Sequence, residues 1–566
     1  MDSTENDHRL TVFLSYDIVS TRYCSLTCRG GMQMTKSHRS FSKELITAFG
    51  ALYLTFVFLG KKIAKLLYEH LARSVYPCYP VIFLFVVFFC ILCFVGLKWL
   101  SRNVRKGFTH YSVKEKLSFR FWGIVTLAFF FLHFAYLMAN YPGGYSPDGY
   151  DQMQQAHTMV FNDHHPFFHT WLFRLLTRIR DSYPFMLTVQ AAAFALAVGY
   201  LAATLHAWGF SMPLIFLLLV FIEANAQTRV ILLHFWKDTT MSILLLILLS
   251  HIINIFLTNG MWLRKWHHWL SSAILLAAIT LVRHNAVLFT APLLVLMFLF
   301  LPKVRLSLVK TTLLVLALIV GVKGPLQSFY QVQPASDTYL EIVGVPMTVL
   351  FSVYQKSAGT MPDDAREFVE SFGSRSEIIQ HFNFGDFNSV KWALNVSQER
   401  LDKTPPKDLL KITWETVKSN SVLSALSFLE LTDFVWEPAD KHYQYLMPLY
   451  PTSVNKVPSS FPQVMGNIKT GLYDFFRLLD EALSIGLIQK PIAQLGVLML
   501  VMILALYISI CNFHGWKSLW LVLPILCYNF GTMLLLCGSD YRFFHFNCLM
   551  VYPLTMLLLI KPQVEK

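Results

Sequence analysis

The chain has 566 residues, of which 55% are hydrophobic and 14% are charged, whereas soluble domains carry about 25% charged residues. This composition excludes a disordered chain, a disulfide-stabilised mini-protein and an ordinary soluble enzyme. The net charge of +13 fits a cell-membrane protein with basic cytoplasmic loops, and no nucleic-acid partner is expected.

The apolar residues come in blocks long enough to cross the roughly 30 Å hydrocarbon core of a bilayer. We therefore expect an all-α polytopic membrane protein with about twelve transmembrane helices. They are centred near residues 52, 88, 128, 195, 218, 248, 277, 294, 315, 501, 527 and 551. Residues 1–43 are predicted to be a cytoplasmic segment, and residues 44–117 to hold two additional spans and a basic loop. Three lysines, at 61, 62 and 65, conflict with this topology, so the first span is alternatively a surface helix.

The basic loops fix the predicted orientation of the chain. Basic residues in the loops 101–120 and 303–310 assign both loops to the cytoplasm. Alternation then places residues 140–183, 223–238, 283–285, 324–490 and 538–543 outside. Residues 118–323 are the predicted transmembrane core, 324–490 an extracytoplasmic region with a small helical domain between spans nine and ten, and 491–566 the C-terminal spans.

The first external loop, 140–183, carries the densest group of polar side chains. Asp148 and Asp151 follow a Pro/Gly-rich break, and His164, His165 and His169 come later in the same loop. In one interpretation the carboxylates cap the next helix and the histidines are structural. In the other, one carboxylate acts as a general base on an acceptor hydroxyl.

Three more polar stretches fall on the same predicted face. They contain Lys237 and Asp238, then Arg283 and Asn285, and finally Asp540 and Arg542. Each has a structural interpretation: a snorkelling or self-paired Lys/Asp, a cation at a hairpin tip, and a salt-bridged turn. Together the four stretches indicate one extracytoplasmic site. Carboxylates beside cations suit transfer from a lipid-phosphate donor, because cations or a metal ion stabilise the phosphate leaving group.

The order of these motifs resembles the GT-C superfamily of membrane glycosyltransferases. The Tyr-Pro-Gly…Ser-Pro-Asp…Gln…His-His-Pro…His-Thr string of the first loop is similar to a largely uncharacterised Gram-positive bacterial branch, and the likeness covers about residues 121–553. The resemblance implies an inverting enzyme that moves a sugar from a polyprenyl-phosphate donor to a cell-envelope glycan, lipid or protein. Two extra N-terminal spans and the position of the extracytoplasmic region depart from better-known members, which leaves the acceptor class open.

The resemblance also implies roles for individual residues. Asp148, with Asp151 as its rival, is the expected catalytic base, and Lys237, Arg283 and Arg542 are expected to bind the donor phosphate. The residues expected to orient substrate are His164, His165, His169, Asp238, Asn285 and Asp540. A divalent metal, Mg²⁺ or Mn²⁺, is left open as a cofactor, with the three histidines as its candidate ligands.

Two other classes of function fit the same hydropathy. A transporter or flippase of a lipid-linked saccharide also suits about twelve spans, although carriers place coupling charges near the bilayer midplane, and here charges gather at one face. A non-catalytic envelope assembly factor is the third alternative, with its extracytoplasmic region binding a partner.

Overall fold

The computed structural model describes residues 36–72, 79–104, 116–144, 146–335, 338–439, 463–483 and 486–561. Within these ranges the chain is helical, and its only extended pairings are two isolated bridges. Seven helices are long and apolar enough to cross a membrane, or eight if one bent pair counts as a single span. The structure therefore agrees with an all-α membrane protein, but seven or eight spans, and not twelve, meet the length criterion.

The seven long spans correspond to seven of the predicted centres. They are built on α2 (Lys36–Ala72), α3 (Tyr79–Asn103), α4 (Phe119–Ala139), α7 (Tyr183–Ala207), α10 (Lys237–Leu257), α13 (Arg305–Gly321) and α25 (Leu495–Ile508). The remaining centres fall in shorter helices: the bent pair α8 (Met212–Ala224) and α9 (Ala226–Leu232), then α11 (Trp266–Val282), α12 (Val287–Phe300), α26 (Leu519–Met533) and α27 (Phe546–Leu558).

The bend between α8 and α9 has a local cause. Asn225 lies in an extended conformation between the two helices, and its side chain accepts a hydrogen bond from the backbone N–H of Gln227. An asparagine in this position caps a new helix and ends the previous one. The two axes differ by 62°, so this segment is a broken span.

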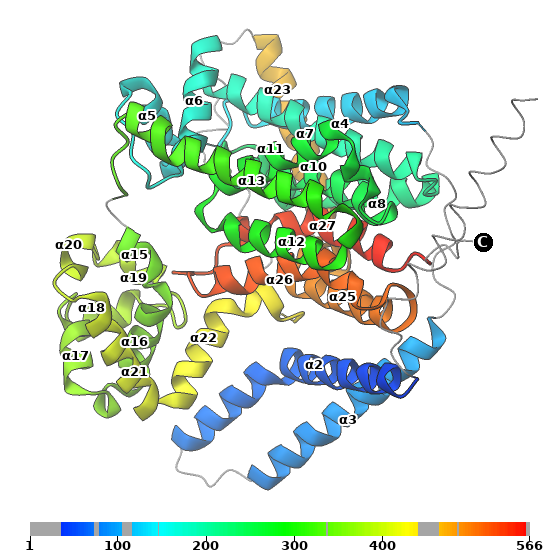
Figure 1. Cartoon of the computed structure of the whole chain (residues 1–566). Helices are drawn as coiled ribbons and strands as arrows, with labels where there is room; N and C mark the ends of the chain where they lie inside the picture. Colours follow the sequence, from blue (N-terminus) through cyan, green and yellow to red (C-terminus); the bar gives the residue numbers. More distant parts are fainter. Residues whose placement is uncertain are drawn as a thin grey trace, which may run out of the picture.

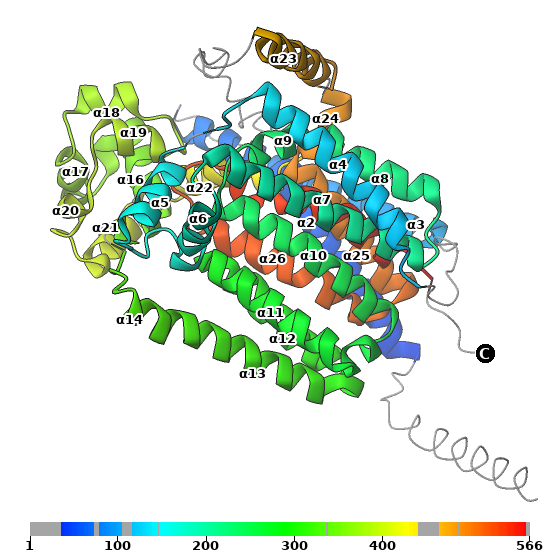
Figure 2. The same cartoon turned by 90° about the horizontal axis from the view of Figure 1, so that it is seen from above.

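The spans pack as a bundle of nearly parallel helices (Figure 2). The closest neighbours are α4 with α7, α7 with α10, α12 with α26, α11 with α13, and α25 with α27. Small residues let α4 and α7 approach closely: a Cβ on Gly199 of α7 would lie 2.3 Å from Thr126 Oγ1 of α4. The largest apolar core of the chain runs through these helices.

The chain alternates direction through the bundle, which brings certain helix ends together. The C-terminal end of α4 leads into α5 (Pro147–Thr158) and α6 (Phe167–Ile179), and the N-terminal end of α10 follows α9. The segments between α11 and α12 and between α26 and α27 reach the same end of the bundle, as the contacts described below show. All four polar stretches singled out in the sequence therefore lie at one end.

A helical lobe stands beside this same end (Figure 1). It consists of α15 (Thr338–Ile342), α16 (Gly344–Ser357), α17 (Asp363–Glu370), α18 (Arg375–His381), α19 (Asn388–Ala393), α20 (Gln398–Leu401) and α21 (Pro406–Ser419), and it has its own apolar core. A Cβ on Gly344 would lie 2.2 Å from the carbonyl oxygen of Leu536. The lobe is thus seated directly on the segment between α26 and α27.

Two further helices of the stretch 324–490 contact the bundle. Helix α22 (Ser421–Trp436) packs on α16 of the lobe as well as on α2 and α25, and α23 (Gln463–Leu483) packs along α4. A short helix, α24 (Gly486–Ala493), then leads into α25. The lobe is therefore about half of the stretch 324–490, and α22 connects it to the bundle.

Candidate functional site

The beginning of the stretch 140–183, which the sequence predicts to be an external loop, is held in place by hydrogen bonds to the segment before α10 and to the start of α7. The Gly144 N–H donates to the Leu233 carbonyl at 2.9 Å, and the Tyr183 hydroxyl donates to the Gly144 carbonyl at 2.9 Å. A Cβ on Gly144 would lie 2.1 Å from Nε2 of His234, so only glycine fits this close approach. These contacts hold the loop by its backbone, so its polar side chains remain available for contacts with other parts of the chain.

Ser146, and not an aspartate, caps the first helix of this loop. Its hydroxyl accepts from the Gly149 N–H at 3.1 Å and from Trp236 Nε1 at 2.7 Å. Asp148 therefore has no capping role in the described structure, although it lies in the first turn of α5. Its carboxylate turns instead toward the segment between α26 and α27.

Arg542 lies between two carboxylates from distant parts of the chain. Its Nη1 donates to Asp148 Oδ2 at 2.9 Å, and its Nε donates to Asp540 Oδ2 at 2.7 Å. Burial opposes ionisation of Asp148, but the charge of Arg542 and then that of Lys237 outweigh it and hold the pKa of Asp148 at about 2. The salt-bridged turn expected at Asp540 and Arg542 is present, and Arg542 additionally binds the first loop.

A second arginine pairs with the carboxylate at the start of α10. Arg283 forms an ion pair with Asp238, and both side chains are buried. The Arg283 Nε also donates to Asn285 Oδ1 at 2.6 Å, and Asn285 in turn donates to Thr532 of α26 at 2.8 Å. Arg542 Nε lies 4.0 Å from Asp238 Oδ2. The two arginine pairs are therefore parts of one network.

Lys237 differs from both arginines. Its ammonium group donates to Nδ1 of His165 at 3.0 Å, and no carboxylate lies within 4.0 Å of it among the residues that the structure describes. Burial, and next the charge of Lys237, lower the pKa of His165 to about 2, so this imidazole is neutral and accepts at Nδ1. Lys237 and Asp238 do not pair with one another, although they are adjacent in the sequence.

The remaining predicted residues of this loop surround the network, and Asp151 reaches its edge, where Oδ2 lies 3.8 Å from Nε2 of His165. His169 is fully buried, where its ring nitrogens contact Gln152 at 3.0 Å and Thr240 Oγ1 at 3.0 Å. Asp151 accepts from a glutamine of its own helix, and its side chain is 44% exposed. His164 packs edge-on against His165, with ring centroids 4.7 Å apart. These positions give His169 a structural role and leave Asp151 open to solvent.

The three histidines do not fit a metal centre. His169 has both ring nitrogens hydrogen-bonded, and the Nδ1 of His165 accepts from an ammonium group. Within the described ranges, no group of three or more histidine, cysteine, aspartate or glutamate side chains has a metal-binding arrangement.

Two side chains behind the site, His234 and Trp236, support it, which is a role that the sequence did not assign to them. His234 stacks on Trp236 with ring centroids 4.1 Å apart, and the guanidinium of Arg542 lies 5.1 Å from the centre of the Trp236 ring. The signal was available, since the His-Phe-Trp triplet directly precedes Lys237. Because its aromatic residues resemble membrane anchors, this signal does not distinguish a support role from anchoring.

A second buried charge network was also missed. Glu223 of α8 contacts His133 of α4 at 3.2 Å and pairs with Arg229 of α9 at 3.3 Å, and Arg229 forms a further ion pair with Asp480 of α23. Arg229 is fully buried. Charged residues on both sides of the broken span were the available signal.

We found no family model, curated protein or solved structure that matches this chain. The resemblance to GT-C glycosyltransferases accordingly stays a prediction based on the motifs of the four stretches. The chemistry that the site can perform follows from its geometry alone.

Proposed function

We propose that this chain is an integral membrane glycosyltransferase of the GT-C type. It transfers a sugar from a polyprenyl-phosphate donor to a cell-envelope glycan, lipid or protein, and its site lies on the extracytoplasmic side of about twelve membrane-crossing segments. The support is the meeting of four polar stretches at one end of an apolar helix bundle, where a lipid-linked donor has access from the membrane and an acceptor from water.

The state of Lys237 is the single observation that carries this proposal. Both arginines of the network form ion pairs with carboxylates, whereas the Lys237 ammonium forms no ion pair within 4.0 Å among the described residues and donates its hydrogen bond to the neutral His165. It also lies at the N-terminal end of the 21-residue helix α10, where the helix dipole favours an anion. Lys237 is therefore the group that binds the donor phosphate and stabilises its charge as it leaves.

Asp148 provides the complementary group for the acceptor. Arg542 holds its Oδ2, while Oδ1 makes no hydrogen bond within the described structure. Asp148 is ionised at physiological pH, so Oδ1 is available to bind the acceptor hydroxyl and to accept its proton as the acceptor oxygen attacks. Arg542 and Asp540 fix the orientation of this carboxylate.

The proposed reaction is a single displacement. The acceptor oxygen forms a bond to the anomeric carbon, the bond from that carbon to the phosphate oxygen breaks, and the hydroxyl proton passes to Asp148. The electron pair of the broken bond remains on the phosphate beside Lys237. Attack from the face opposite the phosphate inverts the anomeric carbon.

The experiment is glycosyl transfer from polyprenyl-phosphate sugars by membranes that contain the full chain. Asp148→Asn is expected to lower the rate by about 10²- to 10⁴-fold, as loss of a general base does. Lys237→Met is expected to lower it at least as much, because the leaving phosphate loses its cation. Asp363→Asn is a matched control, since this carboxylate lies on the lobe and its side chain is 82% exposed.

Protein abundance and thermal stability of each variant separate loss of chemistry from loss of the fold. Asp148→Glu, which keeps the carboxylate, should recover part of the activity if folding is intact. Full activity in both Asp148→Asn and Asp151→Asn would contradict the proposed mechanism.

One observation favours a second candidate function, a transporter or flippase of a lipid-linked saccharide. Broken helices with charged groups at the break are typical of carriers, and Glu223 and Arg229 stand on both sides of the bend between α8 and α9. Movement of a fluorescent polyprenyl-linked sugar across liposomes, without formation of a glycosidic bond, would support transport. Transfer that depends on Asp148 and leaves the lipid unmoved would support the glycosyltransferase.

A further inference from the structure

A polar cavity lies at the end of the bundle opposite the candidate site. Its volume is about 180 Å³, and it is lined by the beginning of span α2, the end of α3 and the end of α25. The helical turn Ser509–Phe513 that follows α25 is near the C-terminal end of α27, because Cys511 and Leu559 belong to the same apolar cluster. Arg542 precedes the other end of α27. The cavity is therefore separate from the network around Asp148.

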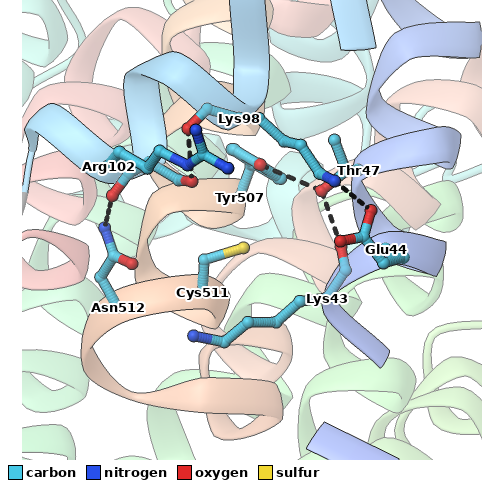
Figure 3. Close-up of a pocket in the computed structure, with 9 residues that line it drawn as sticks. Lys43, Glu44, Thr47, Lys98, Arg102, Tyr507, Cys511 and Asn512 are labelled. Carbon is cyan, nitrogen blue, oxygen red and sulfur yellow. Dashed lines mark hydrogen bonds and ion pairs between the residues drawn. The ribbon is translucent and has the colours of Figure 1, made fainter. Parts of the chain in front are cut away.

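The cavity carries an excess of positive charge. Lys43, Lys98 and Arg102 line it together with one carboxylate, Glu44. Glu44 pairs with Lys98 at 2.7 Å, whereas Lys43 and Arg102 have no carboxylate within ion-pair distance in the described parts of the chain. Figure 3 shows these two side chains reaching into the hollow from different helices, with Cys511 between them.

The neutral groups of the cavity already have partners. Thr47 Oγ1 donates to the Lys43 carbonyl at 2.6 Å and is 3.1 Å from the Tyr507 hydroxyl. Asn512 Nδ2 donates to the carbonyls of Ser101 and Val104, at 2.7 and 3.1 Å. These bonds fix the walls of the cavity. Its two unneutralised cations are the groups left to bind a ligand, so the ligand is an anion.

The position of the cavity identifies the source of that anion. The three helices that line it enter or leave their candidate spans there, at Ser42, Asn103 and Phe513, which is the depth of lipid head groups. On α3, next to the cavity, Val95 and Trp99 are 58% and 65% exposed. An exposed apolar surface next to a basic pocket suits the acyl chains of a phospholipid. Basic pockets between membrane helices bind anionic lipid head groups.

We propose that this cavity binds the phosphate of an anionic phospholipid. Lys43 and Arg102 hold the phosphate oxygens, Lys98 stays paired with Glu44 at the rim, and the acyl chains lie along the exposed apolar surface of α2 and α3. The bound lipid then joins α2 and α3 to α25, so occupancy stabilises the folded chain.

The test is lipid binding to the purified full chain in neutral detergent, followed by native mass spectrometry and thermal unfolding. Phosphatidylglycerol is the probe, phosphatidylcholine the zwitterionic comparison, and inorganic phosphate the lipid-free comparison. We expect phosphatidylglycerol to bind and to raise the melting temperature. In Lys43→Gln/Arg102→Gln its affinity should fall by about tenfold or more, because two basic contacts are lost.

Lys62→Gln/Lys65→Gln is the matched control. It also removes two positive charges, both from exposed positions of α2 that lie near the other end of that helix, and should keep the wild-type affinity. Equal binding by the cavity variant and the wild type would overturn the proposal, and so would an equal loss in the control. Equal stabilisation by phosphatidylcholine, or by inorganic phosphate at the same concentration, would overturn the lipid source.

Discussion

The two ends of the helix bundle both gather basic side chains, but they neutralise them differently. At the candidate site, Arg283 pairs with the buried Asp238, and Arg542 pairs with the partly buried Asp148 and Asp540. In the opposite cavity, Lys43 and Arg102 have no such partner among the described residues. A paired cation positions its neighbours, whereas an unpaired cation is available to a ligand. By this criterion Lys237 is the ligand-binding cation of the candidate site.

The largest effect on the stability of the fold is expected when the buried ion pair between Arg283 and Asp238 is broken. Asp238→Asn leaves the buried guanidinium of Arg283 without its carboxylate, which typically costs about 3–5 kcal/mol. We expect a marked fall in the thermal unfolding temperature of the purified protein. The measurement is thermal unfolding in detergent, monitored by intrinsic fluorescence.

The double variant Asp238→Asn/Arg283→Met is the control for this prediction. Because it removes the orphaned charge together with its partner, it should recover most of the lost stability. If the single and double variants were equally unstable, the pair would not be the source of the effect. A single variant as stable as the wild type would contradict the buried pairing itself.

A smaller effect on stability, which depends on pH, is expected from His169, which is buried behind the site. Burial, and then Lys237, lower the pKa of His169 from 6.5 to about 3. Between these values the unfolded chain binds a proton that the folded chain does not, so stability falls as the pH decreases below 6.5. The contribution is about 1.4 kcal/mol for each pH unit. Above pH 6.5 the imidazole is neutral in both the folded and the unfolded chain, so this loss of stability is absent there.

Unfolding temperatures measured between pH 7 and pH 5 check this prediction. His169→Gln should show a shallower pH dependence than the wild type, because its amide does not titrate. His267→Gln is the comparison, since this side chain is exposed and lies in the first turn of α11, at the cavity end of the bundle. An unchanged slope in His169→Gln would mean that other groups cause the pH dependence.

The helices and the shared end of the four polar stretches could be predicted from the sequence. Apolar blocks separated by basic loops determine where helices form and which of their ends lie together. The fifth, seventh and eighth centres were harder to interpret, because Asn225 divides one span and Arg283 interrupts an apolar run. The sequence therefore predicts about twelve spans, of which seven or eight are formed by helices that are long and apolar enough to cross a membrane.

The pairing of charges could not be predicted, because it depends on contacts between distant residues. Asp148 and Arg542 are 394 positions apart, and no local pattern connects them. Adjacent Lys237 and Asp238 suggested one pair, yet their side chains contact different elements. The opposite cavity was invisible for the same reason, since Lys43, Lys98 and Asn512 come from three helices that only tertiary packing brings together.

The smallest effect on stability is expected when a carboxylate at the cavity end is replaced by its amide, as Asp238→Asn does at the candidate site. Glu44→Gln breaks an ion pair whose side chains are 48% and 35% exposed, and exposed pairs contribute only about 0–1 kcal/mol. The unfolding temperature should therefore change little, in contrast to Asp238→Asn. Binding of phosphatidylglycerol should become tighter by several-fold, because Lys98 is released to the phosphate. Weaker binding in Glu44→Gln would show that this carboxylate organises the cavity, and the contrast between the two ends would then fail.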